Sequence, residues 1–227
     1  MNIAKQRVVI LGGTSGIGYA TAEAATERGA EVVIVSRHPS DAAARLGVTG
    51  LAADLAHPPA GLFDEIGPFD HLVYTAGEQL ALAPIASVDA RAFFGLRYFG
   101  AIAAIQGALP HLTPGGSITL TSGTAADRPG PGWSIPASIC GAIEALTRAL
   151  AVELAPVRVN AVKPGVTRSP MWGPAEITSQ LYADTAATVP LGRVGEVTDV
   201  ADAYLYLMSQ PFTTGTILPV DGGALLA

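Results

Sequence analysis

A cluster of glycines near the start of the chain, VVILGGTSGIG, is suited to holding a phosphate group. Its glycines follow directly on an apolar run and open a stretch with helical spacing. Glycine permits a tight turn and close approach of a pyrophosphate, and a helix N-terminus offers free N–H groups. The loop therefore predicts dinucleotide binding, with a purely structural turn as the alternative. The residues expected to contact the cofactor are Gly12, Thr14, Ser15, Gly16, Ile17 and Gly18.

The second apolar run ends in VSRHPS, where the type of nicotinamide cofactor is usually selected. A site for NAD commonly has a carboxylate here, which binds the ribose 2′-hydroxyl. This chain has Ser36 followed by Arg37, and a guanidinium can neutralise a 2′-phosphate. We therefore predict that both residues bind NADPH or NADP and that NADH is disfavoured. The alternative for Arg37 is a solvated surface side chain.

Arg97 stands in the middle of an otherwise apolar helical stretch, AFFGLRYFGAIAAI. A buried guanidinium without a partner is costly, so its side chain should face solvent, a carboxylate or a ligand. A position in the active-site cleft is one interpretation. A solvent-facing arginine, or one paired across a subunit interface, is the other.

The elements that must position these residues alternate between short β-branched runs and longer Ala/Leu-rich stretches. Such alternation predicts an α/β fold: a Rossmann-like, doubly wound parallel sheet of about seven strands in a three-layer α/β/α arrangement. No linker interrupts it, so residues 1–227 are predicted to form one domain, with the substrate loop within 165–195. Strands are expected at 7–11, 31–36, 48–54, 69–77, 116–123, 157–162 and 216–220, and helices at 16–28, 41–46, 58–66, 89–112, 136–154 and 197–209.

The composition excludes several functions. A formal net charge of −6 and a pI near 5.1 argue against nucleic acid and anionic membranes as partners. The single cysteine, Cys140, excludes an internal disulfide and, with no signal-peptide pattern, predicts a cytoplasmic protein. Charged or amide side chains interrupt the longest apolar stretches, so we predict no membrane span. The four histidines show no metal-ligand spacing, so we predict no metal site.

At this point the sequence resembles the short-chain dehydrogenase/reductase family along essentially its whole length. GGTSGIG resembles the family's TGxxxGIG loop, AADL its adenine-contacting segment and YTAG its NNAG motif. The block ALTRALAVELAPVRVNAVKPGVTRSPMW is similar to the most recognisable part of the family. The resemblance implies a nicotinamide cofactor, a homo-oligomer (tetramer or dimer), and further cofactor contacts from Asp54, Leu55, Ala76, Gly77, Pro164, Gly165, Thr167 and Ser169.

The resemblance breaks down at the catalytic residues. Family members work with Asn, Ser, and a Tyr and Lys spaced Y-x-x-x-K. In the family register the lysine position falls on Cys140, the tyrosine on Pro136 and the asparagine on Arg97, while Ser122 keeps the serine. Proline cannot donate a proton, and a thiol in an apolar helix is usually inert packing. We therefore predict Ser122 and Arg97 as catalytic residues, with Arg97 holding ribose or polarising a carbonyl oxygen.

Two classes of function remain open. The first is an NADPH-dependent carbonyl reductase or alcohol dehydrogenase with a non-standard active site, acting on a small carbonyl or alcohol compound. The second is a non-redox NADP(H)-binding protein, a sensor or scaffold, on the same fold. Ser122 and Arg97 favour the enzyme, whereas Pro136 and Cys140 favour the binding protein. Substrate choice is expected to reside in residues 165–195 and 77–87, with Trp133 and Trp172 shaping the pocket.

Overall fold

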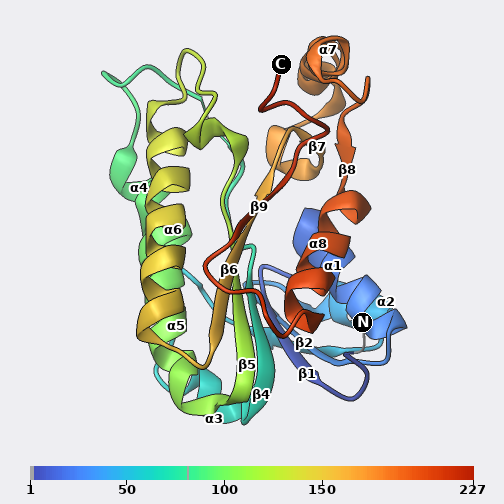
Figure 1. Cartoon of the computed structure of the whole chain (residues 1–227), viewed down its shortest axis with the longest axis vertical. Helices are drawn as coiled ribbons and strands as arrows, with labels where there is room; N and C mark the ends of the chain where they lie inside the picture. The colour runs from blue at the N-terminus through green and yellow to red at the C-terminus, as the bar shows by residue number, and fades with distance from the viewer. Residues whose placement is uncertain (1–2, 81) are drawn as a thin grey trace.

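A central parallel sheet of seven strands organises the chain in a computed structural model, which describes residues 3–80 and 82–227 (Figure 1). Its strand order is β3-β2-β1-β4-β5-β6-β9, and every neighbouring pair is parallel. The predicted α/β class, parallel sheet and strand number are confirmed. The strands span Arg7–Leu11 (β1), Glu31–Ser36 (β2), Thr49–Ala52 (β3), Phe69–Tyr74 (β4), Leu112–Thr121 (β5), Arg158–Pro164 (β6) and Ile217–Val220 (β9).

Helices cover both faces of the sheet, because most strands are apolar on both sides. Two groups of helices pack on opposite faces of the sheet (Figure 1). Between each group and the sheet lies a separate hydrophobic core. The first core holds Leu11, Leu72 and Ile118 of the sheet, and the second holds Ile10, Val32 and Val162. The first group is α4 (Ala90–Phe94), α5 (Gly100–Ala108) and α6 (Ser134–Glu153), and the second is α1 (Gly16–Glu27), α2 (Ser40–Leu46) and α8 (Val197–Ser209); the short α3 spans Leu62–Ile66.

The strand order reverses beside β1, and this fixes where a ligand can bind. The chain runs from β1 outward to β2 and β3, then crosses back to place β4 on the other side of β1. The loops after β1 and β4 therefore diverge and leave a crevice at the carboxyl ends of these strands. Both the glycine loop and the segment after Tyr74 lie at this edge.

The expected continuous helix over 89–112 is wrong in detail. It divides into α4, a π-helical turn at Gly95–Phe99, α5 and a 3-10 turn at Leu109–His111. A π turn breaks the regular i→i−4 ladder and is frequent at functional sites. Here the turn contains Arg97, and the carbonyl of Leu96 accepts a hydrogen bond from the Tyr74 hydroxyl at 2.6 Å.

Residues 165–195, which we expected to be a long loop, contain regular structure. They carry β7 (Thr167–Arg168), a 3-10 turn at Pro170–Trp172 and α7 (Ala175–Thr188), and β7 pairs with β8 (Gly195–Glu196) in a second, two-stranded sheet. This segment stands at the upper end of the molecule in Figure 1. The other segment expected to select substrate, 77–87, includes residue 81, which lies outside the described residues.

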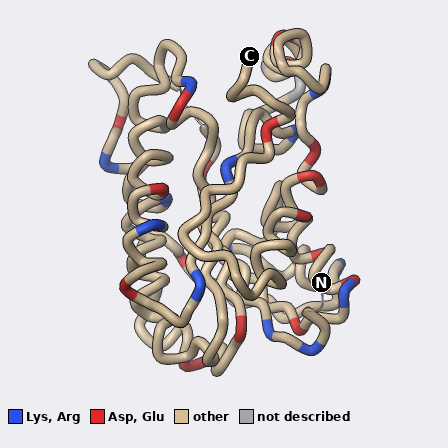
Figure 2. Tube along the Cα trace, in the orientation of Figure 1, with Lys and Arg blue, Asp and Glu red and all other residues tan. Residues whose placement is uncertain are grey.

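Two helical stretches, Ala90–His111 and Ser134–Glu153, are long and apolar enough to cross a membrane by length and composition alone. Both instead pack on the sheet, where Ala101, Ala104, Ile139 and Ile143 join the first core. Acidic and basic residues are interspersed along the trace (Figure 2). No continuous basic stripe appears in this view of the described residues, in keeping with the acidic composition.

Candidate active site

A cavity of about 750 Å³ opens at the carboxyl edge of the sheet. It is lined by every residue that the sequence analysis assigned to the cofactor or to catalysis, although these residues come from distant parts of the chain. Their roles stay predictions, but their convergence on one cavity is a property of the fold. The predicted residues in its wall are Gly12, Thr14, Ser15, Gly16, Ile17, Gly18, Ser36, Arg37, Asp54, Leu55, Ala76, Gly77, Arg97, Ser122, Pro164, Gly165, Thr167 and Ser169.

The glycine loop has no room for side chains at two of its positions. Gly12 adopts a φ of +97°, and a Cβ there would lie 2.6 Å from the backbone nitrogen of Ala76. A Cβ on Gly18 would collide with the carbonyl oxygen of Gly12. The loop, the start of α1 and the end of β4 are thus packed backbone to backbone. The first turn of α1 faces the cavity, which is the arrangement that binds a pyrophosphate.

The end of β2 presents a polar edge at one end of the cavity. The Ser36 hydroxyl is buried and has no hydrogen-bond partner among the described residues. Arg37 and His38 follow it, exposed, on the cavity wall. Asp54 lies on the same wall, and its carboxylate accepts a hydrogen bond from the backbone N–H of Ala56 at 3.0 Å.

Arg97 is held by a carboxylate at the cavity wall. Its Nε donates to Oε1 of Glu78 at 3.2 Å, and Nη2 donates to the Glu78 backbone carbonyl. The guanidinium lies flat against Gly77, where a Cβ would come within 2.7 Å of Cζ. Arg97 therefore meets the expectation of a carboxylate partner and also lines the cavity. Oε2 of Glu78 is buried and receives no hydrogen bond from a described residue.

Ser122 is part of a buried polar chain. Its hydroxyl donates to Oε1 of Glu144 at 2.9 Å, and the same oxygen lies 2.8 Å from Nζ of Lys163. Nζ also donates to Asp127, whose side chain is half exposed. Burial opposes the charge of Lys163, but the hydrogen bonds to Asp127 and Glu144 raise the pKa of the ammonium above its usual value. The chain runs from the cavity wall at Ser122 to solvent at Asp127.

Pro136 and Cys140 both line the cavity, one turn apart on α6. Helix α6 begins two residues before the predicted start, so that Pro136 falls in the first turn, where the missing N–H costs nothing. Burial raises the pKa of the Cys140 thiol to about 11, so the thiol stays protonated at neutral pH. A protonated thiol is a poor nucleophile, in keeping with the predicted packing role.

Three charged residues of this region were missed by sequence reasoning. Lys163 directly follows the predicted strand VRVNAV, and Glu144 interrupts an apolar helix. Charges in such settings are almost never buried without partners, and this was the available signal. Asp127 gave no signal, because it lies in a loop with no pattern of its own.

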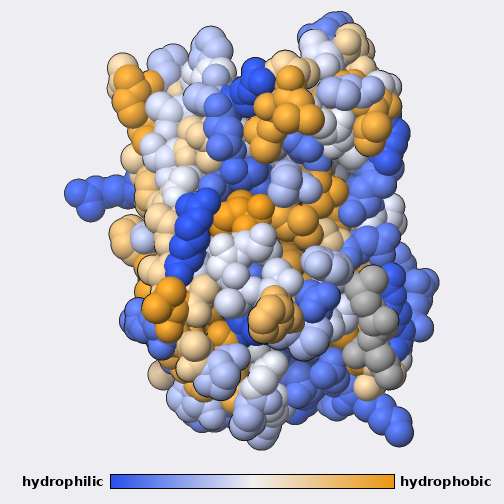
Figure 3. All heavy atoms as spheres, viewed as in Figure 1, coloured by the Kyte–Doolittle hydropathy of each residue, from blue (hydrophilic) through white to orange (hydrophobic). Residues whose placement is uncertain are grey.

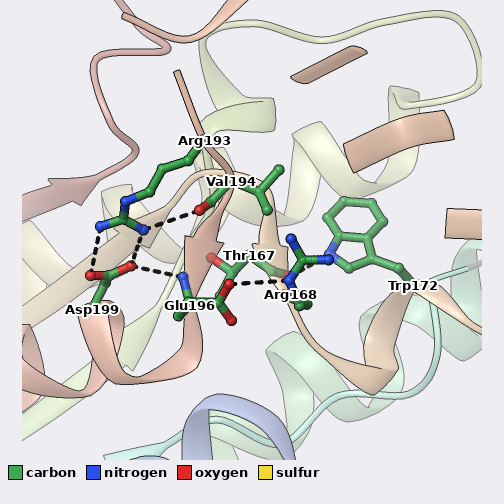
Figure 4. Close-up of polar contacts among 7 residues, drawn as sticks. All are labelled: Thr167, Arg168, Trp172, Arg193, Val194, Glu196 and Asp199. Atoms are coloured by element: carbon green, nitrogen blue, oxygen red, sulfur yellow. Dashed lines mark hydrogen bonds and ion pairs between the residues drawn. The ribbon is translucent and has the colours of Figure 1, made fainter. Parts of the chain in front are cut away.

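The far end of the cavity is aromatic and apolar. The rings of Trp133 and Trp172 lie with their centroids 5.9 Å apart and tilted by 53°. The indole N–H of Trp172 donates to the carbonyl of Thr167 at 2.9 Å (Figure 4). Further apolar residues that line the cavity are Leu80, Phe93, Leu96, Ile139 and Met171.

The chain is similar to known proteins over nearly its whole length. A family model described as enoyl-(acyl carrier protein) reductase matches residues 12–224. The chain is 37% identical to the short-chain dehydrogenase/reductase ATR9 of Stachybotrys chlorohalonatus, over 97% of each. It is 34% identical to L-xylulose reductase of Bos taurus, over 99% of this chain and 98% of that protein. A crystal structure of a small-chain dehydrogenase in complex with NADPH is similar, with a TM-score of 0.88 at 37% identity, covering 98% of this chain and 100% of that one.

Proposed function

The chain belongs to the short-chain dehydrogenase/reductase family of oxidoreductases, and from this premise we propose that it is an NADPH-dependent enzyme interconverting a carbonyl compound and an alcohol. One observation carries the proposal. A single cavity joins a phosphate-binding glycine loop, a basic edge after β2 and a serine hydroxyl linked to a buried proton-bearing chain. Hydride transfer needs a bound nicotinamide and a proton donor or acceptor at the substrate oxygen.

The residues present fit a dinucleotide. The backbone cradle at Gly12 and Gly18 would be filled by any Cβ, and the free N–H groups of α1 suit a pyrophosphate. The buried, unpartnered Ser36 hydroxyl is the orphaned group that a ribose phosphate would satisfy. When bound, the nicotinamide would supply or accept the hydride.

NADPH is favoured over NADH by charge. No carboxylate stands at the end of β2, and Arg37 and His38 flank the cavity there. A guanidinium pairs with a 2′-phosphate through charge-assisted hydrogen bonds, whereas it gains little from a hydroxyl. The related structure in complex with NADPH supports the same choice.

We further infer that the proton travels through Ser122, because nowhere in the 227 residues does a lysine follow a tyrosine at the fourth position. In the alcohol-oxidising direction, a substrate hydroxyl would donate its proton to Ser122 as Ser122 donates to Glu144. In reduction the same path runs backwards: the new alkoxide takes the Ser122 proton, Ser122 takes one from the Glu144–Lys163 pair, and water restores it beside Asp127. Arg97 adds a fixed positive charge that stabilises a developing oxyanion.

A non-redox NADP(H)-binding protein is the second candidate, supported by Pro136 and Cys140, which the sequence register assigns to the family's tyrosine and lysine positions and which line the cavity. The two candidates differ in one observable. Both require NADPH binding, but only the enzyme transfers hydride to a second compound.

We also propose a cytoplasmic homo-oligomer, a dimer or tetramer. Support comes from apolar side chains that remain exposed, including Phe99 at 59% and Val152 of α6 at 81%. In the space-filling view, apolar side chains are interspersed with polar ones along the side of the molecule that α6 occupies, at the left of Figure 3. A free cysteine fits a reducing compartment. Light scattering on the purified protein tests the assembly, and a monomer at micromolar concentration would contradict it.

The decisive experiment follows NADPH oxidation by the purified protein against aliphatic and aryl ketones, aldehydes, diketones, quinones and ketoses. Ser122→Ala and Arg97→Ala are run beside the native chain, and NADPH binding is measured separately for each. We expect turnover with NADPH, reduced at least about a hundredfold in Ser122→Ala with cofactor affinity retained. Binding without turnover across the whole set would instead establish the non-redox candidate.

A further inference from the structure

Two polar side chains of the cavity wall, Arg97 and Ser122, are already engaged with carboxylates. Arg97 pairs with Glu78, and Ser122 donates to Glu144. A sugar-like polyol needs a partner for each hydroxyl, and every polar group left unpaired costs about 1–3 kcal/mol. The wall is mostly apolar, and the polar groups left in it include the Ser122 oxygen lone pairs, the remaining guanidinium donors, Oε2 of Glu78 and the side chains of Gln79 and Thr124.

The remaining surface is a rigid aromatic wall, formed by Trp133 and Trp172. At 5.9 Å between centroids and a tilt of 53°, the two rings contact each other and cannot sandwich a ligand between them. They form a V-shaped face instead. Trp133 comes from the loop before α6 and Trp172 from the segment after β7, so the wall joins the two sides of the cavity.

A hydrogen bond to the backbone of β7 fixes the position of the Trp172 ring. Its only polar atom is tied to the Thr167 carbonyl, so the ring presents apolar surface alone. Thr167 belongs to β7, which pairs with β8 and is also joined to it by the Arg168–Glu196 ion pair at 3.1 Å (Figure 4). We call this paired unit the β7–β8 clasp. Arg193 holds Asp199 in turn with two hydrogen bonds, of 2.6 and 2.9 Å. A preorganised apolar face of this kind loses little entropy on binding.

Met171 precedes Trp172, and its carbonyl accepts a hydrogen bond from the backbone N–H of Leu80 at 2.9 Å, so both apolar residues extend the wall. Methionine adapts its shape and makes favourable contacts with aromatic rings. Aromatic pairs in tilted or offset geometry contribute about 0.5–1.5 kcal/mol beyond the area they bury. A flat ring system therefore gains contacts with this surface that a polyol, with little apolar area, cannot make.

We propose that the substrate is a flat aromatic carbonyl compound, an aryl ketone or fused-ring quinone, whose rings lie on the Trp133–Trp172 wall with the carbonyl oxygen toward Ser122. The inference rests on the proposed oxidoreductase function for its chemistry, but the ligand class rests on the wall itself. A ketose such as L-xylulose is the contrasting ligand.

The sequence provides its own reporter. Trp133 and Trp172 are the only two tryptophans of the chain, and both line the cavity, so all tryptophan emission comes from this site. Energy transfer to NADPH measures cofactor binding without turnover. Calorimetry with the NADP-loaded protein then measures binding of 1-tetralone, 1,4-naphthoquinone and L-xylulose, with no reaction needed.

We expect saturable binding of the ring compounds and at least tenfold weaker binding of L-xylulose. Trp172→Leu and Trp133→Leu should each weaken ring binding by roughly tenfold, and Trp133→Leu should change the Kd for NADPH less than twofold. Trp172→Phe should retain most of the affinity because it keeps a ring face. Phe212→Leu, at a side chain 99% exposed and outside the cavity, is the matched control.

The outcomes separate the two proposals. L-xylulose binding as tightly as the ring compounds, or ring binding unchanged in both leucine variants, would overturn the inferred ligand class. Ring binding that depends on the tryptophans, without NADPH oxidation, would uphold the ligand class and defeat the proposed redox function. If Trp172→Leu fails to fold by circular dichroism, Trp133→Leu, whose indole lies outside the β7–β8 clasp, decides the question.

Discussion

Glu144 and Lys163 form an ion pair in the interior, with Oε1 2.8 Å from Nζ and side chains exposed by 9% and 8%. The pair joins α6 to β6 directly behind the cavity wall, and Ser122 donates to the same carboxylate oxygen. A serine linked in this way is positioned by the core of the protein rather than by solvent. The stability of the fold and the chemistry of the site are therefore coupled at one carboxylate.

Breaking this pair should destabilise the protein strongly. Lys163→Met removes the buried cation from Glu144 and leaves it only the largely exposed Arg148 at 3.6 Å, and we expect a loss of about 3 kcal/mol in the free energy of unfolding by urea. Lys163→Met combined with Glu144→Met should recover much of that loss, because Asp127 can still reach water. Arg168→Ala, which breaks an exposed pair, should cost less than about 1 kcal/mol. Additive single and double effects would show that the pair is not coupled.

Arg37→Ala should change cofactor preference. Removing the guanidinium deprives a 2′-phosphate of a charge-assisted partner worth about 1.5–3 kcal/mol, so the Kd for NADPH should rise roughly 10- to 100-fold. The Kd for NADH should stay nearly constant, since it carries no such phosphate. Arg45→Ala, on the neighbouring α2, is the control for general loss of positive charge. Equal weakening of both cofactors would count against a specific contact from Arg37.

Gly12→Ala should abolish NADPH binding. The left-handed backbone at +97° is strained for alanine, and the new methyl group would press on the backbone at Ala76. Gly141→Ala on α6 is the matched control, because a Cβ there meets nothing within 4 Å. That control should bind NADPH normally and gain about 0.5–1 kcal/mol of stability, as helix interiors prefer alanine. Unimpaired NADPH binding by Gly12→Ala would contradict the proposal that the backbone at Gly12 and Gly18 holds the cofactor.

Acid should weaken the fold through His71. Burial lowers the pKa of His71 to about 4. The positive charge of Arg158 lowers the pKa further, and the negative charge of Asp70 opposes both effects. Its ring nitrogens contact Ser117 at 2.8 Å and Gln6 at 3.1 Å. The unfolded chain binds a proton at its ordinary pKa near 6.5, whereas the folded protein does not. Stability from this group is thus complete above pH 6.5 and lost as the pH falls toward 4, by up to ~3 kcal/mol.

Urea unfolding of His71→Asn at pH 7, 5.5 and 4.5 checks the acid prediction. The variant should start less stable at pH 7 but lose less stability on acidification than the native chain. His38→Asn, at an exposed histidine, should follow the native pH dependence. Parallel loss in His71→Asn and the native chain would assign the acid sensitivity to other groups.

The sequence alone determined the sheet, because period and composition are local properties. Residues 7–11 and 31–36 read as strands and are β1 and β2 within the same bounds, and residues 197–209 are the predicted last helix. The glycine loop was equally readable, since its spacing and its strand and helix neighbours are contiguous. All residues assigned from these patterns line one cavity, because parallel strands deliver their carboxyl ends to one edge.

Only the tertiary structure decided the chemistry beyond the loop. Ser122, Glu144 and Lys163 belong to three different elements, and no local pattern states that their side chains meet at one oxygen. The π turn at Arg97 likewise depends on packing against Gly77 and Tyr74 rather than on helix propensity. Trp133 and Trp172 come together from opposite sides of the cavity. Element type follows from short-range periodicity, whereas contacts between elements follow from strand order and core packing, which a single sequence does not display.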